Sequence, residues 1–226
     1  MSSAVFGIAI DQEYLRSLPE YSDKKEITQS DLAREALKTK NSQEKDTDVL
    51  RYVTNVDMNG SVNRACKIVY YNATGATLEL VTTKDWHGHN GPSPIPLTVH
   101  NGQWAGFVHT KTSSAAAGST GAVVYRGPGL DGKKRDWMMS WSNPFDRASW
   151  DNSVYAEVRD TDHFTQGGIW DVIYSYLSKK ADIATGPDGQ RCIEIPADKA
   201  GNAKMTMNTG SDTHPVVEAV FTLQDL

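Results

Sequence analysis

Two stretches, Gly121-Ala-Val-Val-Tyr-Arg126 and Asp136-Trp-Met-Met-Ser-Trp141, decide the fold class of this chain. Both contain the β-branched or aromatic residues that favour strands over helices. In the second stretch Trp137, Met139 and Trp141 occupy alternate positions, so an extended backbone would place all three side chains on one face. We therefore predict two strands, with these three side chains in the core.

The same strand-forming composition recurs on both sides of these stretches. Turn signals such as Asn72-Ala-Thr-Gly75 separate the runs at about the 8–12-residue spacing that is typical of a β-sandwich or barrel. One helix interrupts the pattern near residues 169–178, where apolar side chains follow helical spacing. We predict a mainly β protein with a β-sandwich domain over residues 62–226. Its other strands are expected at 66–71, 77–83, 103–110, 153–159, 191–195 and 216–223.

The first 61 residues differ from the rest, because they contain two short amphipathic patterns of helical spacing. Ser30 is expected to cap a helix over 31–38. A second helix is predicted by apolar residues at spacing i, i+3, i+4 and i+7, which are Val49, Tyr52, Val53 and Val56. We expect residues 1–61 to form an extended leader and two short helices packed on the sandwich.

Composition and charge restrict the class of protein. The chain has 226 residues, enough for one sizeable core, and a net charge of −5, which argues against a nucleic-acid partner. The amino-terminus lacks the basic segment of a secretory signal, and two cysteines are too few for a disulfide framework. We therefore expect a soluble cytoplasmic protein in which Cys66 and Cys192 are free thiols.

The aromatic segment Trp141-Ser-Asn-Pro-Phe-Asp-Arg-Ala-Ser-Trp150 is the strongest candidate for a binding site. Pro144 ends the strand pattern, so Phe145 and Trp150 have no partner at strand spacing. Aromatic rings beside Ser, Asn and Asp suit a sugar or a choline-type ligand, because rings stack or hold a cation while polar groups orient it. The alternative is structural: the rings plug the end of the sandwich.

Two other pairs of residues carry weaker chemical signals. His87 and His89 would share one side of a strand, but the spacing supplies no third ligand, and we expect no metal there. Glu157 and Arg159 lie two residues apart on a predicted strand and therefore on one face. An RNA N-glycosidase could use an acid and an arginine in such an arrangement. A surface ion pair on a sheet explains the second pair more simply.

Several motifs together resemble the plant twenty-three-kilodalton jasmonate-induced proteins. They include Ala4-Val-Phe-Gly7, Tyr71-Asn-Ala-Thr-Gly75, Asp85-Trp-His-Gly88, Asn101-Gly-Gln-Trp104 and Ala116-Ala-Gly-Ser-Thr-Gly-Ala-Val-Val-Tyr-Arg126. The similarity extends from the leader to about residue 126 and is weaker beyond that residue. It implies an intracellular plant protein that is induced in stress or defence.

The order of the strands and the aromatic loop also resembles, more distantly, the actinoporin-like β-sandwich. That resemblance implies a headgroup pocket at Ser142, Pro144, Trp150, Trp170 and Tyr174. The chain departs from the pattern, because tryptophans stand at two positions where tyrosines are usual and the Arg-Gly-Asp contact motif is absent. The leader also lacks one continuous amphipathic helix, which argues against pore formation.

These observations favour a non-enzymatic stress- or defence-related protein that binds a glycan or a lipid headgroup, with peripheral membrane contact and without a cofactor. Two alternatives are an actinoporin-type pore-forming toxin and a ribosome-directed N-glycosidase. The second lacks a convergent acid–base set in the sequence. The residues expected to bind the ligand are Ser142, Pro144, Phe145, Asp146, Trp150, Trp170 and Tyr174.

Overall fold

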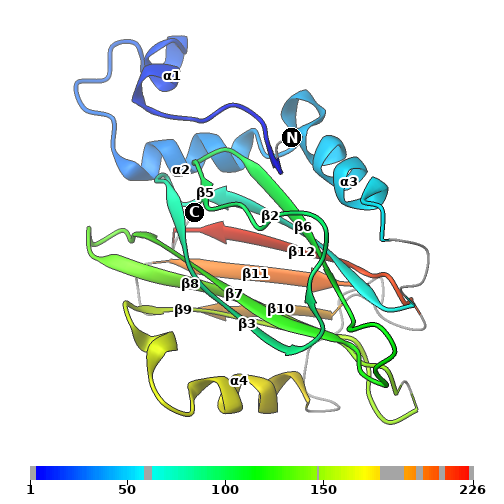
Figure 1. Ribbon diagram of the computed structural model, residues 1–226. Helices are drawn as coiled ribbons and strands as arrows, with labels where there is room; N and C mark the ends of the chain where they lie inside the picture. The colour runs from blue at the N-terminus through cyan, green and yellow to red at the C-terminus, as the bar shows by residue number, and fades with distance from the viewer. Residues whose placement is uncertain are drawn as a thin grey trace.

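Two β-sheets packed face to face form the centre of the protein in its computed structural model (Figure 1). Helices α1, α2 and α3 lie over one side of this sandwich and helix α4 lies over the other (Figure 1). The structure describes residues 4–58, 63–146, 148–178, 201–208 and 212–223, and the backbone alone of 191–196.

The first sheet has the strand order β1-β6-β2-β12-β11-β10, with β4 also paired to β6. Strands β12 and β2 run parallel, and the other pairs in this sheet are antiparallel. The bounds are β1 (Val5–Phe6), β2 (Ala65–Ala73), β4 (His89–Asn90), β6 (Trp104–Thr110), β10 (Arg191–Pro196), β11 (Asn202–Met207) and β12 (Val216–Thr222).

The second sheet is antiparallel throughout and has the order β5-β3-β7-β8-β9. Its strands are β3 (Leu78–His87), β5 (Thr98–Val99), β7 (Ser119–Pro128), β8 (Lys134–Asn143) and β9 (Ser153–Asp160). The predicted alternation along β8 is confirmed, because Trp137, Met139 and Trp141 all lie in the core between the sheets.

A buried chain of hydroxyl groups joins the two sheets. The Tyr125 hydroxyl donates to the carbonyl oxygen of Pro96 over 2.6 Å. The hydroxyl of Tyr70, on β2, therefore donates its own hydrogen to Tyr125, on β7. Buried hydroxyls are costly unless they find partners, so this chain fixes one sheet against the other and against the loop before β5.

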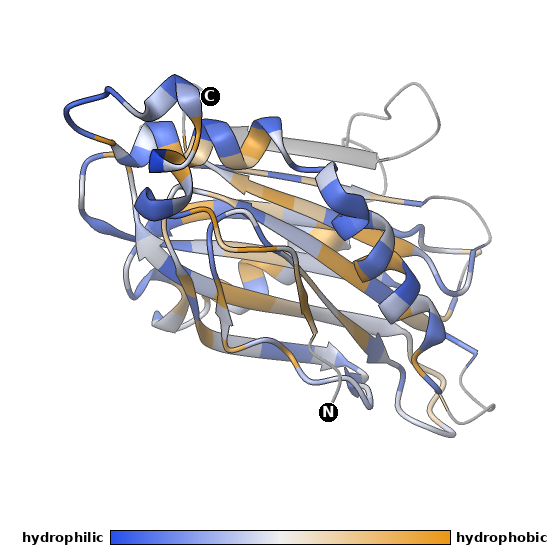
Figure 2. Ribbon diagram, turned by 90° about the horizontal axis from the view of Figure 1, so that it is seen from above, coloured by the Kyte–Doolittle hydropathy of each residue, from blue (hydrophilic) through white to orange (hydrophobic). Residues whose placement is uncertain are grey.

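The outer face of the first sheet is also apolar, and the amino-terminal helices cover it. Val49 and Val53 of α3 (Lys45–Asn55) are fully buried against β6. Gly106 allows this close approach, because a Cβ atom there would lie 2.8 Å from a methyl group of each valine. Figure 2, seen from the helical side, shows bands of hydrophobic residues in these helices and in the strands beneath them.

Helix α2 (Gln29–Lys38) begins two residues earlier than the predicted helix over 31–38. Thr28, not Ser30, is the N-cap, and it forms a capping box with Asp31. At the far end of the helix the Tyr71 hydroxyl of β2 donates to the carbonyl oxygen of Ala36 over 2.6 Å. The helix is therefore fixed to the sheet by a hydrogen bond as well as by apolar contact.

The predicted fold class is confirmed: a mainly β, two-sheet protein with a helical amino-terminal segment and one short helix, α4 (Ile169–Leu177). The sequence pattern missed the strand β11 and the short helix α1 (Gln12–Arg16) in the segment expected to be extended. Short 3₁₀ turns complete the structure at Pro19–Tyr21, Ser42–Glu44 and His163–Thr165. Among the described residues, no helix is both long enough and apolar enough to cross a membrane.

The leader is packed more tightly than its composition suggests, and this predicts a stability difference. Leu15, in α1, is 0% exposed, whereas Leu97, before β5, is 73% exposed. We expect Leu15→Ala to lower the free energy of unfolding by about 2–5 kcal/mol and Leu97→Ala by less than about 0.5 kcal/mol. Urea denaturation of the two variants measures the difference, and equal losses would show that α1 does not belong to the cooperative unit.

Candidate functional site

A pocket of about 480 Å³ opens at one end of the sandwich, where β8 ends and α4 crosses the second sheet. Six of the seven residues predicted to bind a ligand line it, and they come from β8, the loop after it, and α4. These six are Ser142, Pro144, Phe145, Asp146, Trp150 and Tyr174.

Local structure around Pro144 explains why the loop residues face this pocket. Asn143 ends β8 and is buried, and its side-chain amide donates to the carbonyl oxygens of Ala65 and Thr213. The next residue is Pro144, which cannot donate a further ladder hydrogen bond, so the chain turns away from the sheet. The Asp146 carboxylate then accepts from the backbone N–H of Ala148 over 3.0 Å, which closes a tight turn.

The two aromatic rings of this loop are exposed. The residues Phe145 and Trp150 are 41% and 44% exposed, so they do not plug the end of the sandwich. The ring of Phe145 lies 5.0 Å from the Lys111 ammonium and 5.9 Å from the Arg64 guanidinium. Exposed aromatics with cations beside them form a surface that is apolar at its centre and charged at its edge.

Tyr174 closes the pocket from the side of α4. Its hydroxyl lies 3.0 Å from Nε2 of His87, and its ring lies 5.6 Å from the ring of Trp86. Strand β3 therefore fixes the position of Tyr174 through two side chains. The hydroxyl of Ser142 pairs with that of Thr120 over 3.1 Å and forms the polar base of the pocket.

Trp170 does not line this pocket, unlike the other six predicted residues. Its ring packs against Trp86 at 5.8 Å and Phe164 at 5.9 Å, in a small apolar cluster beneath α4. Trp170 lies one helical turn before Tyr174 on the same helix, and that turn places it beyond the pocket.

Negative charge gathers at the pocket. Asp146, Asp151 and Asp171 line it, and none of the described lining residues is Lys or Arg. The Asp171 carboxylate has no hydrogen bond or ion pair among the residues described, so it is available to a ligand. Sequence reasoning missed Asp171, although its helical spacing from Tyr174 and Ser178 would have placed the three on one face.

The two histidines that would share one side of a strand are separated. Gly88 adopts φ +93° between them and ends β3, so His87 lies on β3 and His89 on β4. His87 contacts Tyr174, whereas His89 lies 3.4 Å from the Thr110 hydroxyl. Across the part of the chain that the structure describes, no three His, Cys, Asp or Glu side chains gather as a metal site requires.

Glu157 and Arg159 share one face of β9, as expected from their spacing. Nε of Arg159 donates to the Glu157 carboxylate over 2.9 Å, and Tyr155 donates to the same oxygen over 3.2 Å. The expected ion pair is present: the Glu157 carboxylate is buried, and the Arg159 side chain that covers it is 44% exposed. Neither residue lines the pocket at the end of the sandwich.

One further cluster has the composition of a hydrolase triad. Nδ1 of His109 lies 2.8 Å from the Ser119 hydroxyl, and Nε2 lies 3.1 Å from the Asp85 carboxylate. Ser119, however, is 0% exposed, so a substrate cannot reach its oxygen. Burial lowers the pKa of His109, although Asp85 opposes the shift, and the imidazole links β6 to β7 and β3.

The two packed sheets and the pocket at one end of them define the class, which is a small β-sandwich protein with an open pocket beyond the ends of its strands. Within that class the chain belongs to the family described as Nakanori-like protein, whose model matches residues 6–224. The structure of the lipid binding protein Nakanori is 29% identical, covers 96% of this chain and 98% of its own, and superposes with a TM-score of 0.81.

Two plant relatives confirm the resemblance to jasmonate-induced proteins. The 23 kDa jasmonate-induced protein of Hordeum vulgare is 39% identical over 82% of this chain and 86% of its own length. The jasmonate-induced protein homolog of Atriplex canescens is 25% identical over 73% of this chain and 84% of its own. Neither name denotes an enzyme.

The tryptophans provide a test of which rings belong to the core. We expect Trp137→Ala to cost about 3–5 kcal/mol of unfolding free energy and Trp150→Ala less than about 1 kcal/mol. Trp170→Ala should fall between them, because its ring is half-buried against two other aromatic rings. Denaturant midpoints of the three variants decide the matter, and a loss for Trp150→Ala equal to that for Trp137→Ala would place the Trp150 ring in the core.

His109 predicts a dependence of stability on pH. Its pKa in the folded protein lies below the ordinary value of 6.5, so the unfolded chain binds a proton first as the pH falls. We expect the free energy of unfolding to decrease as the pH is lowered from 7 through 6.5, the ordinary pKa of histidine. The His109→Gln variant should be less stable but should show a flatter profile in that interval. An unchanged slope in the variant would assign the titration to another group.

Proposed function

We propose that this protein binds the choline-type headgroup of a lipid in the pocket at the end of the sandwich, without catalysis. The observation that carries the proposal is the position of three aromatic side chains and three carboxylates around one opening. The positive charge of a quaternary ammonium is attracted to ring faces and to carboxylates. Neither interaction requires a hydrogen-bond donor, which a quaternary ammonium lacks.

The rest of such a headgroup has partners as well. The Ser142 hydroxyl can accept from Thr120 and donate its own hydrogen to a phosphate oxygen. Arg64 lies 5.9 Å from the centre of the Phe145 ring and is partly exposed, so it can reach the phosphate of a neighbouring lipid at the surface. The exposed rings of Phe145 and Trp150 suit the boundary between headgroups and acyl chains, where aromatic residues are common.

The relatives support this choice of ligand. A lipid is favoured over a glycan in this pocket because the structure that superposes over 96% of the chain is described as a lipid binding protein. The names of the plant relatives support a role in a jasmonate-linked stress or defence response. The free, buried thiol of Cys66 is consistent with the cytoplasmic location that we include in the proposal.

The two alternative functions find less support in the described residues. Pore formation by the leader would require Ile10 and Leu15 to leave buried positions and β1 to separate from β6. An N-glycosidase would require an accessible acid, whereas Glu157 is buried and already paired with Arg159.

Vesicle binding tests the proposal. We expect the protein to cosediment with phosphatidylcholine or sphingomyelin vesicles more strongly than with phosphatidylglycerol vesicles, and soluble phosphocholine to compete. Trp150→Ala should weaken binding about tenfold or more, because an anchoring aromatic typically contributes at least that much. Asp171→Asn should also weaken it, whereas Leu97→Ala, which alters an exposed side chain away from the pocket, should not.

The same vesicles, loaded with dye, separate binding from pore formation. Binding without release of dye is expected, because the leader stays on the sheet. Strong release would favour the toxin alternative. Equal binding to all headgroups, or equal binding by the wild type and Trp150→Ala, would contradict the headgroup pocket, and competition by a free sugar instead of phosphocholine would favour the glycan.

A further inference from the structure

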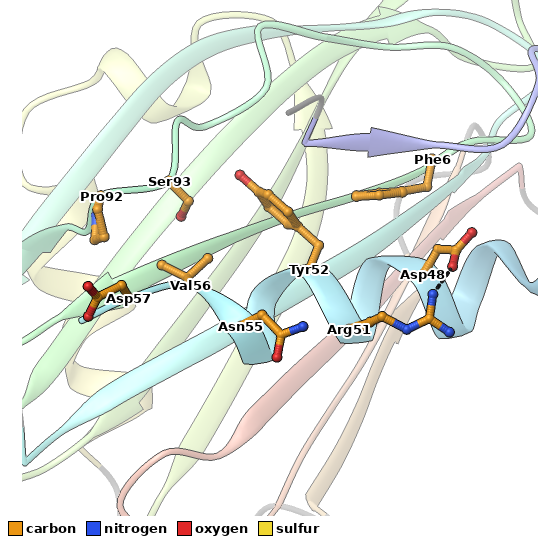
Figure 3. Close-up of a pocket in the computed structure, with 9 residues that line it drawn as sticks. All are labelled: Phe6, Asp48, Arg51, Tyr52, Asn55, Val56, Asp57, Pro92 and Ser93. Atoms are coloured by element: carbon orange, nitrogen blue, oxygen red, sulfur yellow. Dashed lines mark hydrogen bonds and ion pairs between the residues drawn. The ribbon is translucent and has the colours of Figure 1, made fainter. Parts of the chain in front are cut away.

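A second pocket lies on the helical side of the sandwich, away from α4 (Figures 1 and 3). It has a volume of about 560 Å³ and is bounded by α3, by the strand β1 and by the loop that follows β4. None of its lining residues belongs to the pocket at the end of the sandwich.

Two aromatic rings form one wall of this pocket (Figure 3). The centroids of Phe6 and Tyr52 are 5.5 Å apart and their planes are inclined by 50°. Phe6 is held by the pairing of β1 with β6, and Tyr52 is held because Val49 and Val53, on the same helix, are fully buried. Both rings are half-buried, so each is fixed by packing and still offers part of its surface to a ligand.

Polar groups follow the rings along the exposed side of α3. Asp48, Arg51, Tyr52 and Asn55 have the spacing i, i+3, i+4 and i+7, which places them on one face of the helix. An ion pair of 2.7 Å orients Arg51 toward Asp48. The Asn55 amide and the Tyr52 hydroxyl have no hydrogen-bond partner among the described residues.

This combination restricts the chemistry of a ligand. Two carboxylates, Asp48 and Asp57, line the pocket with only one guanidinium, so an anionic ligand is disfavoured. Arg51 neutralises Asp48 and would repel a compact cation placed between them. A neutral ligand with an apolar face and several hydroxyls fits both the rings and the polar groups. Each hydroxyl could donate to a carboxylate and accept from an amide or a guanidinium.

We infer that this second pocket, with Tyr52 as its platform and Asn55, Arg51 and Asp48 as its hydrogen-bonding groups, binds a neutral carbohydrate. A pyranose ring presents an apolar face of C–H groups and a periphery of hydroxyls, which matches the arrangement along α3. The protein would then hold a lipid headgroup at the end of the sandwich and a sugar on its helical side, so that one molecule could bridge a membrane and a glycan.

Titration calorimetry with neutral hexasaccharides tests the inference. The probes are cellohexaose, xylohexaose, mannohexaose and chitohexaose, each added to the full-length protein. We expect at least one to bind the wild type, and Tyr52→Ala to weaken that binding about tenfold or more. Asn55→Ala should weaken it as well and should leave stability unchanged, since the Asn55 side chain is exposed and makes no hydrogen bond to any residue that the structure describes.

The matched control is Trp150→Ala, which removes the principal ring of the other pocket. It should leave sugar binding as it is in the wild type. The inference is overturned if no probe binds, or if binding survives in both Tyr52→Ala and Asn55→Ala. It is also overturned if Trp150→Ala removes sugar binding, which would place the sugar in the pocket at the end of the sandwich.

Failure of this test leaves the lipid proposal unaffected, because vesicle binding depends on the other pocket. If Tyr52→Ala does not fold, sugar binding by Asn55→Ala and Tyr52→Phe is compared with that of the wild type instead. Tyr52→Phe keeps the ring and removes the hydroxyl that has no partner, so it should reduce binding less than Tyr52→Ala does.

Discussion

Burial of both faces of β2 and β6 is the constraint on which the rest of the structure depends. Along β2, Ile68 and Tyr70 enter the space between the sheets, whereas Val69 and Tyr71 face the helices. A sheet that is apolar on both faces needs a cover on each side. The amino-terminal segment supplies one cover and the second sheet supplies the other, so the helices are structural parts of the sandwich.

This arrangement leaves the ends of the strands open, and the pocket at the end of the sandwich lies there. The helices and the second sheet cover the first sheet without help from Phe145 and Trp150. These two side chains therefore have no role in the core and can stay exposed. On the helical side, too, other residues form the core: Val49 and Val53 hold α3 on the sheet, and Tyr52 of the same helix is only half-buried. Both pockets are therefore built from residues that neighbouring core residues hold in place.

The sequence predicts the parts of this fold in which one periodicity dominates. Trp137, Met139 and Trp141 reveal their strand because every second residue is large and apolar, and Pro144 marks where the loop begins. Strand β11 was missed because its inward residues, Ala203, Met205 and Met207, have weak strand preferences, although they alternate with polar neighbours. Resemblance to the actinoporin-like sandwich places Trp170 in the pocket, whereas only three-dimensional packing shows that Phe164 and Trp86 hold it elsewhere.

The parallel pairing of β12 with β2 has a consequence for how the protein is made. β12 lies inside the first sheet, between β2 and β11, although it is the last of the described strands along the chain. About two-thirds of the 226 residues separate Val217 from its partner Ile68, so this sheet cannot close until β12 has been synthesised. Contacts of such large sequence separation form slowly. Until β12 is in place, the edge of β2 that it covers has no partner strand, and unpaired edges of this kind make a folding chain prone to aggregation.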